Sequence, residues 1–126
     1  MDRFLIVFIG GGMGSGVRYG ASLLAGKTLG TGFAWGTLLV NLAGCFLIGV
    51  NLGLAENTNI MQPSLRLFFV TGFLGGLTTF SSYALESVVA MRGGVLAAML
   101  NIAANNIAGL ALVLAGVKLV EIFTGG

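Results

Sequence analysis

Polar side chains recur at helical spacing within stretches that are otherwise apolar. Three such pairs lie four residues apart: Thr37 with Asn41, Ser82 with Glu86, and Asn101 with Asn105. Residues four apart share a helix face, and polar groups inside a membrane are unfavourable without a partner or a function. Each pair has two interpretations, hydrogen bonding between helices and a polar pathway. Several such faces in one chain of 126 residues favour the pathway.

The residue types on these faces indicate what a pathway would carry. Proton relays in membranes use chains of Asp, Glu or His, whereas here Glu86 is the one deep acid and the chain has no histidine. Neutral amides and hydroxyls donate hydrogen bonds, which suits an anion. Phe80 and Tyr83 lie three residues apart, and the positive edge of an aromatic ring can face an anion without a formal charge. Taken alone, such a pair is usually core packing.

The segment from Thr71 to Thr79 combines three glycines with three threonines. These residue types disfavour a continuous helix, and we expect the third apolar run to be broken at Gly72–Thr79. Backbone carbonyls freed at membrane depth must find partners, because lipid offers none. Again two interpretations stay open: the carbonyls bind a cation, as in other interrupted membrane helices, or a neighbouring helix repairs the kink.

Four apolar runs must position these residues. The chain is 56% hydrophobic and 8% charged, with a mean hydropathy of +1.01, which excludes a soluble domain. The runs cover residues 4–25, 35–55, 65–90 and 95–123, and a bilayer core needs about 20 apolar residues per helix. We therefore predict an all-α integral membrane protein of four transmembrane helices, with residues 1–126 as a single transmembrane domain. Gly12 and Gly16 form a G-x-x-x-G pair, typical of close helix packing.

Charge and cysteine content exclude several classes of function. The six basic and four acidic residues are scattered, so no basic patch indicates nucleic acid as a partner. One cysteine without any histidine does not supply the ligands of a zinc or haem site.

The charges at the ends of the runs are nearly balanced across the membrane. With the N-terminus in the cytoplasm, Arg3, Arg66 and Lys118 lie inside and Lys27 and Arg92 outside. The positive-inside rule needs a clear excess on one side, which three against two does not give. Either a small protein simply has few charges, or both orientations are made, which would allow an antiparallel homodimer.

Three segments resemble the Fluc/CrcB family of fluoride channels. Residues 72–83, GFLGGLTTFSSY, resemble the family signature GxxGGxTTFSTF. Residues 35–44, WGTLLVNLAG, resemble its GT-x-x-x-N-x-x-G second helix, and the glycines at 10–12 with Arg18 and Tyr19 resemble its first. The likeness covers the whole chain. Two positions depart from the commonest pattern, Ser82 in place of Thr and Tyr83 in place of a second Phe.

The resemblance implies a passive, fluoride-selective channel rather than an enzyme. Its setting would be the bacterial plasma (inner) membrane, where a multi-pass protein exports cytoplasmic fluoride. The resemblance also implies an antiparallel, dual-topology homodimer with two pores and a structural Na⁺ held by the main-chain carbonyls of Gly75 and Thr78. The residues that match its fluoride pathway are Phe80, Tyr83, Asn41, Ser81, Ser82, Thr37, Glu86, Asn106 and Arg18. Arg18 would attract anions to a vestibule, and the match at Asn106 is the weakest.

Other functions remain as alternatives. A small multidrug-resistance-type exporter also has four helices and inserts both ways, but it exchanges protons at a glutamate in the first helix. Here that run has Arg18 and no acid. A non-transporting accessory subunit predicts neither coherent polar faces nor a broken helix. Within the channel interpretation the Tyr83 hydroxyl must find a partner, of which Asn106 is one candidate, or donate directly to the ion. Of these we expect it to be a tolerated addition, because the commoner Phe works without it.

Overall fold

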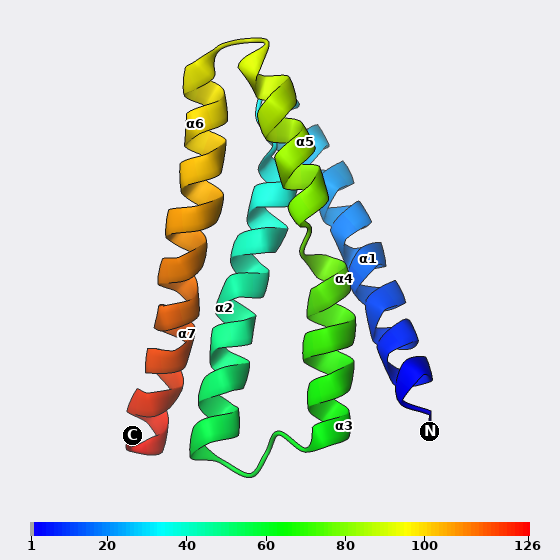
Figure 1. Cartoon of the computed structure of the whole chain (residues 1–126), viewed down its shortest axis with the longest axis vertical. Helices are drawn as coiled ribbons and strands as arrows, with labels where there is room; N and C mark the ends of the chain where they lie inside the picture. The colour runs from blue at the N-terminus through cyan, green and yellow to red at the C-terminus, as the bar shows by residue number, and fades with distance from the viewer. Residues whose placement is uncertain (1) are drawn as a thin grey trace.

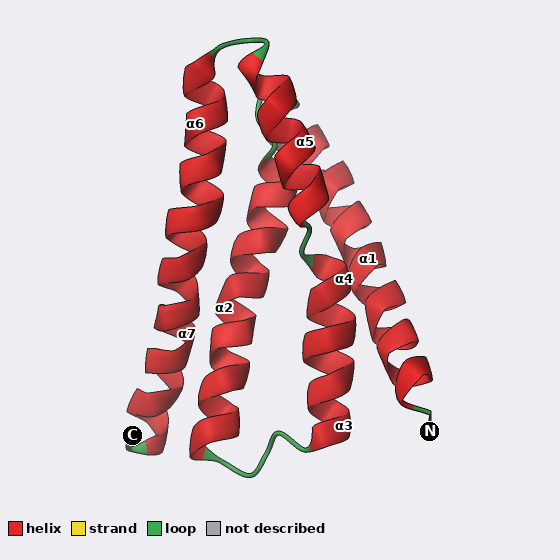
Figure 2. Ribbon diagram, in the orientation of Figure 1, coloured by secondary structure: helices red, strands yellow, loops and turns green. Residues whose placement is uncertain are grey.

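The computed structural model describes residues 2–126, and all of its regular elements are helices (Figures 1 and 2). The first two helices are α1 (Arg3–Thr28) and α2 (Trp35–Asn57). The third consists of α3 (Pro63–Arg66), η1 (Leu67–Leu74) and α4 (Gly75–Leu77), followed after a break by α5 (Phe80–Met91). The fourth is continuous through α6 (Val95–Ala103), η2 (Ala104–Ala108) and α7 (Gly109–Thr124). The stretches η1 and η2 have the wider turns of a π-helix.

Glycines let α1 pack directly against the backbone of η1 and α4. A Cβ atom at Gly14 would overlap the carbonyl oxygen of Phe73 and lie 2.8 Å from the nitrogen of Leu77. A Cβ atom at Gly10 would lie 2.5 Å from the carbonyl oxygen of Phe68. Small residues allow this close approach where lipid supplies no hydrophobic driving force between helices. The expected pair of Gly12 and Gly16 is not the contact, because added Cβ atoms there would meet nothing within 4 Å.

The same principle places α2 beside α7, so that α2 lies between α7 and α4 in Figure 1. A Cβ atom at Gly49 would overlap the carbonyl oxygen of Val113, and one at Gly116 would overlap that of Phe46. On its other side α2 contributes Val40 to a small buried cluster with Leu74 and Leu77. The second helix is therefore the central element of the bundle.

The break in the third helix is shorter than the expected Gly72–Thr79. Only Thr78 (φ −85°, ψ 155°) and Thr79 (φ −151°, ψ 122°) have extended backbone, whereas residues 72–77 are helical. The expectation was wrong for 72–77 because Gly72 and Gly76 meet the backbone of α1, where a side chain would not fit. Helix α4 ends where both the N–H and the hydroxyl of Thr78 donate to the carbonyl of Leu74, at 3.0 and 2.9 Å.

Three of the four helices are long and apolar enough to cross a membrane: α2, the Pro63–Met91 helix and the Val95–Thr124 helix. The remaining helix, α1, has 26 residues but carries Arg18 and a run of glycines. Many large apolar side chains are exposed on the outside of the bundle, which fits lipid or a protein partner and not water. This is the architecture of a multi-pass membrane protein.

The chain folds back and forth so that both termini lie at one end of the bundle. The loop at 58–62 lies at the same end, and the turn at 92–94 lies at the opposite one (Figure 1). Pro63 is the first residue of the third helix. A proline is tolerated there because an N–H at the first helical position would have no acceptor within the helix. Gly94 has φ 143°, a conformation that favours glycine and that allows the tight turn into α6.

Candidate functional site

The break is held by the side chain of Asn41 from α2. Its Oδ1 accepts a hydrogen bond from the N–H of Thr79 at 2.8 Å, and its Nδ2 donates to the carbonyl of Thr79 at 3.1 Å. One amide side chain thus pairs both backbone groups of a residue that has left the helix. The hydroxyl of Thr79 in turn accepts from the N–H of Ser82 at 3.3 Å and caps α5. The N–H and carbonyl of Thr79 and the N–H of Ser82 are therefore paired without water.

A directed chain of hydrogen bonds leads from Asn41 to α5. Asn41 donates to Asn105 (3.0 Å), Asn105 to Asn101 (3.1 Å), Asn101 to the hydroxyl of Ser87 (2.9 Å), and Ser87 to the carbonyl of Tyr83 (2.8 Å). A carbonyl only accepts, so the final bond fixes the direction of the preceding ones. Asn101 is 2% exposed. The fourth helix is thereby tied to both α2 and α5 through neutral groups alone.

The wide turns of η2 have a local cause. The amide nitrogens of Asn105 and Asn106 donate to the carbonyls of Asn101 and Ile102, each four residues earlier and each at 2.8–2.9 Å. These carbonyls are the normal acceptors of the backbone N–H groups of Asn105 and Asn106. Side chains that compete for them loosen the helical ladder, and π-type turns are frequent at functional sites. As a result one asparagine faces α2 and its neighbour faces Tyr83.

A cavity of about 370 Å³ opens beside the break, and we call it the break cavity. Its lining consists of Asn41, Gly44, Cys45, Ile48, Val70, Leu74, Gly75, Thr78, Thr79, Phe80, Tyr83, Asn105 and Asn106. The rings of Phe80 and Tyr83 lie with centroids 5.4 Å apart and planes inclined at 58°. Among the residues that the structure describes, no charged side chain lines the break cavity. Its lining includes two aromatic rings, asparagine amides, the hydroxyls of Tyr83, Thr78 and Thr79, and freed backbone.

The hydroxyl of Tyr83 has a defined partner. Asn106 Nδ2 donates to it at 2.9 Å and to the carbonyl of Ile102 at 2.8 Å. Both hydrogens of the Asn106 amide are therefore used within the protein. The same holds for Asn41, whose two amide hydrogens go to Thr79 and Asn105. Although both asparagines line the break cavity, they position other groups in it.

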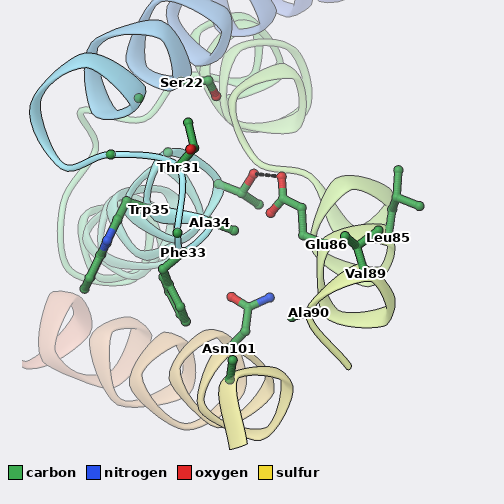
Figure 3. A pocket seen from close by; sticks show the side chains of 16 residues that line it. Ser22, Thr31, Phe33, Ala34, Trp35, Leu85, Glu86, Val89, Ala90 and Asn101 are labelled. Atoms are coloured by element: carbon green, nitrogen blue, oxygen red, sulfur yellow. Dashed lines mark hydrogen bonds between the residues drawn. The ribbon is translucent and has the colours of Figure 1, made fainter. Parts of the chain in front are cut away.

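A second cavity, of about 420 Å³, lies between the ends of α1, α2, α5 and α6, and we call it the Glu86 cavity (Figure 3). Thr37 donates to Glu86 Oε1 at 2.7 Å, while the buried Oε2 has no hydrogen-bond partner among the described residues. Figure 3 shows Glu86 and Asn101 pointing into the same space. Asn101 belongs to the directed chain, whose members Asn41, Asn105 and Tyr83 line the break cavity, so one hydrogen-bonded network borders both cavities.

The structure brings together six of the nine residues predicted for the pathway. Phe80, Tyr83, Asn41 and Asn106 line the break cavity, and Thr37 and Glu86 line the Glu86 cavity. Ser81, Ser82 and Arg18 line neither cavity of the single chain. Ser81 lies 3.4 Å from the hydroxyl of Thr79 at the start of α5. Arg18 is half-buried within α1, and the ion pair found within residues 2–126 is Lys118 with Glu121.

The carbonyls of Gly75 and Thr78, predicted as cation ligands, have lost their helical donors. In a continuous helix Gly75 would accept from the N–H of Thr79, but that N–H donates to Asn41. Thr78 would accept from the N–H of Ser82, but that N–H donates to the hydroxyl of Thr79. Two carbonyl oxygens are therefore available beside the same cavity. Freed carbonyls of this kind are suitable ligands for a hard monovalent cation.

Several contributing residues were absent from the predicted site. Asn101 and Asn105 were recognised only as a polar face, and their spacing of four was the available signal. Thr79 was recognised only as part of the predicted break, and Ser87 gave no signal, because a single serine in a membrane helix usually bonds its own backbone. Cys45, the one cysteine of the chain, lines the break cavity. Its place follows from its position one turn after Asn41 on α2.

The Asn41 contacts predict a large stability effect. Asn41→Ala removes the partner of both backbone groups of Thr79 and of Asn105, and each buried group left unpaired costs about 1–3 kcal/mol. We expect a clearly lower midpoint of thermal unfolding in detergent. The control is Asn59→Ala in the exposed 58–62 loop, which should unfold like the unmodified protein. Equal midpoints for the two variants would refute the role of Asn41 in holding the break.

The chain matches the family model described as "CrcB-like protein, Camphor Resistance (CrcB)" over residues 5–117. It is 41% identical to the "Fluoride-specific ion channel FluC" of Azobacteroides pseudotrichonymphae over 124 residues, which are 98% of this chain and 99% of that protein. It is 42% identical to the protein of the same name from Salinibacter ruber over 127 residues, covering 100% and 95%. A third, from Chlorobium phaeobacteroides, is 49% identical over 94 residues, covering 75% and 72%. The match spans all four helices at this identity, and the chain therefore belongs to the CrcB family.

Proposed function

We propose that this protein is a fluoride-selective channel through which fluoride moves passively out of the cytoplasm. The relatives are named as fluoride-specific ion channels, and ion channels are not enzymes. The observation in this chain that carries the proposal is the break cavity, lined by two aromatic rings and neutral polar groups without a formal charge. Such a lining stabilises an anion through dipoles. The surrounding membrane would be the bacterial inner membrane.

The pathway runs between the two cavities along α5. Phe80 and Tyr83 line the break cavity, while Thr37 of α2 and Glu86 of α5, hydrogen-bonded to each other, line the Glu86 cavity. Ser81 and Ser82, at the first turn of α5, would add hydroxyl donors where a second copy completes the wall. Asn41 and Asn106 contribute by positioning Thr79 and Tyr83. Arg18 would raise the local concentration of anions at an entrance.

We further propose that two copies assemble in antiparallel orientation and form two pores. Phe80 lies at the break cavity, yet it is 79% exposed in the single chain. A pore residue with so much free surface needs a second wall, and a second copy supplies one. Both termini and the 58–62 loop lie at one end of the bundle, and the turn at 92–94 lies at the other. The weak charge bias across the membrane supports insertion in both orientations.

A structural Na⁺ fits the break between two such copies. The carbonyl oxygens of Gly75 and Thr78 from both chains would hold it, and neither carbonyl keeps its helical donor. The ion would supply a fixed positive charge that stabilises the freed backbone at membrane depth. The carbonyls of the third helix are available because Asn41 holds Thr79 in its extended conformation.

No observation favours a proton-coupled multidrug exporter. Exchange by such proteins requires a membrane-embedded acid in the first helix, and α1 contains neither Asp nor Glu.

The ring of Phe80 provides the direct test of function. Unmodified protein in liposomes should release fluoride, measured with a fluoride electrode, under an imposed gradient with potassium and valinomycin balancing charge. Phe80→Ile keeps an apolar wall but removes the positive ring edge, so we expect the rate to fall at least about tenfold, or about 1.4 kcal/mol in the barrier. Phe123→Ile, at a ring that is 81% exposed near the C-terminus, is the matched control. No fluoride release by the unmodified protein would refute the proposed function.

The dual topology can be tested on the C-terminus. A cysteine or tag placed after Gly126 should be labelled by an impermeant reagent from both sides of the membrane in comparable amounts. Adding two lysines at one end should shift the population toward a single orientation, because the existing bias is small. Labelling of the unmodified protein from one side only would exclude the antiparallel dimer.

The sodium proposal predicts a specific ion effect on stability. Replacing Na⁺ with N-methylglucamine should lower the thermal unfolding midpoint of the dimer and reduce fluoride release. Thr78→Ser should behave like the unmodified protein in both media, because it keeps the main-chain oxygen and the hydroxyl that donates to Leu74. Unchanged midpoints and unchanged release without sodium would show that the carbonyls have another function.

A further inference from the structure

Tyr83 lies one turn after the start of α5, and its hydroxyl is oriented by a neighbour. Asn106 reaches it across the break cavity from η2, with Nδ2 2.9 Å from the phenol oxygen. The same nitrogen lies 2.8 Å from the carbonyl of Ile102. Because a backbone carbonyl only accepts, the atom of Asn106 between these two oxygens must be the amide nitrogen. The phenol oxygen is therefore the acceptor of this hydrogen bond.

A phenol that accepts one hydrogen bond still has its own proton to donate. The bond from Asn106 occupies a lone pair of the oxygen, so the O–H must point away from the Asn106 amide. Hydrogen bonds in series polarise one another, and an accepting hydroxyl becomes a better donor. Tyr83 lines the break cavity together with Phe80 and Asn105. The cavity itself is the space in which an acceptor for that proton would lie.

We infer that the Tyr83 hydroxyl donates a hydrogen bond to the anion in the break cavity, and that Asn106 sets its direction. The ligand class is a small, strongly hydrogen-bonding monovalent anion, for which a phenol O–H is a better partner than a ring edge. This inference rests on the proposed function and adds a donor that a phenylalanine at this position lacks. It reverses the sequence-based expectation that the hydroxyl is merely tolerated, because the sequence did not reveal that Asn106 leaves its proton free.

The competing explanation is structural: the hydroxyl would serve only to pair an amide hydrogen of Asn106. The two explanations differ in a double variant. If the hydroxyl contacts the anion, Tyr83→Phe should slow fluoride release about ten- to a hundredfold, the range for losing a hydrogen bond to a charged group. Asn106→Leu, which leaves the hydroxyl present but unoriented, should slow it less. The double variant should be as slow as Tyr83→Phe alone.

If the role is structural, removing both polar groups together should be nearly neutral. The double variant would then recover most of the rate, and that result would overturn the inference. The matched control is Tyr19→Phe, the same substitution at the other tyrosine of the chain, which is 68% exposed on α1. It should release fluoride like the unmodified protein.

A spectroscopic readout tests the contact without transport. In the Tyr19→Phe variant Tyr83 is the single tyrosine, so a near-ultraviolet difference spectrum on adding sodium fluoride reports its hydroxyl. We expect a shift to longer wavelength with fluoride that equal concentrations of sodium chloride do not produce. Adding Tyr83→Phe should abolish it. No fluoride-dependent shift in a variant that conducts would overturn the inference.

The experiments separate this inference from the proposal on which it rests. If the unmodified protein releases no fluoride, the channel function fails and the inference fails with it. If it releases fluoride and Tyr83→Phe does so at the same rate, the inference alone fails and the channel function stands.

Discussion

The central constraint on this molecule is that the backbone N–H and carbonyl groups freed by a broken helix at membrane depth need hydrogen-bond partners within the protein. Lipid offers no partners, and each unpaired group costs several kcal/mol. Asn41 meets this constraint at Thr79, where one amide pairs an N–H and a carbonyl. Because the remaining hydrogen of Asn41 goes to Asn105, the fourth helix is fixed by the same side chain. The arrangement of α2, the break and η2 follows from this one requirement.

The two halves of the third helix depend on different neighbours. Below the break, η1 and α4 pack against α1 through glycines such as Gly14, without room for a side chain. Above it, α5 is tied to α6 by the hydrogen bond from Asn101 to Ser87. The break thus separates a half fixed by backbone contact from a half fixed by polar side chains. The two halves are joined by only two residues with extended backbone, Thr78 and Thr79.

Much of the architecture could be read from the sequence, because apolar runs of sufficient length have few alternatives in a membrane. The predicted runs lie inside the observed helices, and the spacing of Thr37 with Asn41 and of Asn101 with Asn105 identified faces that do contain the network. The sequence did not indicate which side chains bond one another or which helix faces pack together. Nothing local indicates that Asn41 bonds the backbone of Thr79, or that Gly10 and Gly14, rather than Gly12 and Gly16, face the third helix. Those facts depend on how helices far apart in sequence are rotated.

Conduction requires that an ion be bound well enough to enter and weakly enough to leave. A full charge beside the path would hold an anion strongly in a medium of low dielectric constant. Here the break cavity is lined by asparagine amides, aromatic rings and one phenol, without a charged side chain among the residues that line it. Internal pairing then decides which of these groups can act on the ion: Asn41 and Asn106 use both amide hydrogens within the protein, whereas the proton of Tyr83 remains free. The hydrogen-bonded network therefore leaves only a few of the polar groups free to donate to an anion in the cavity.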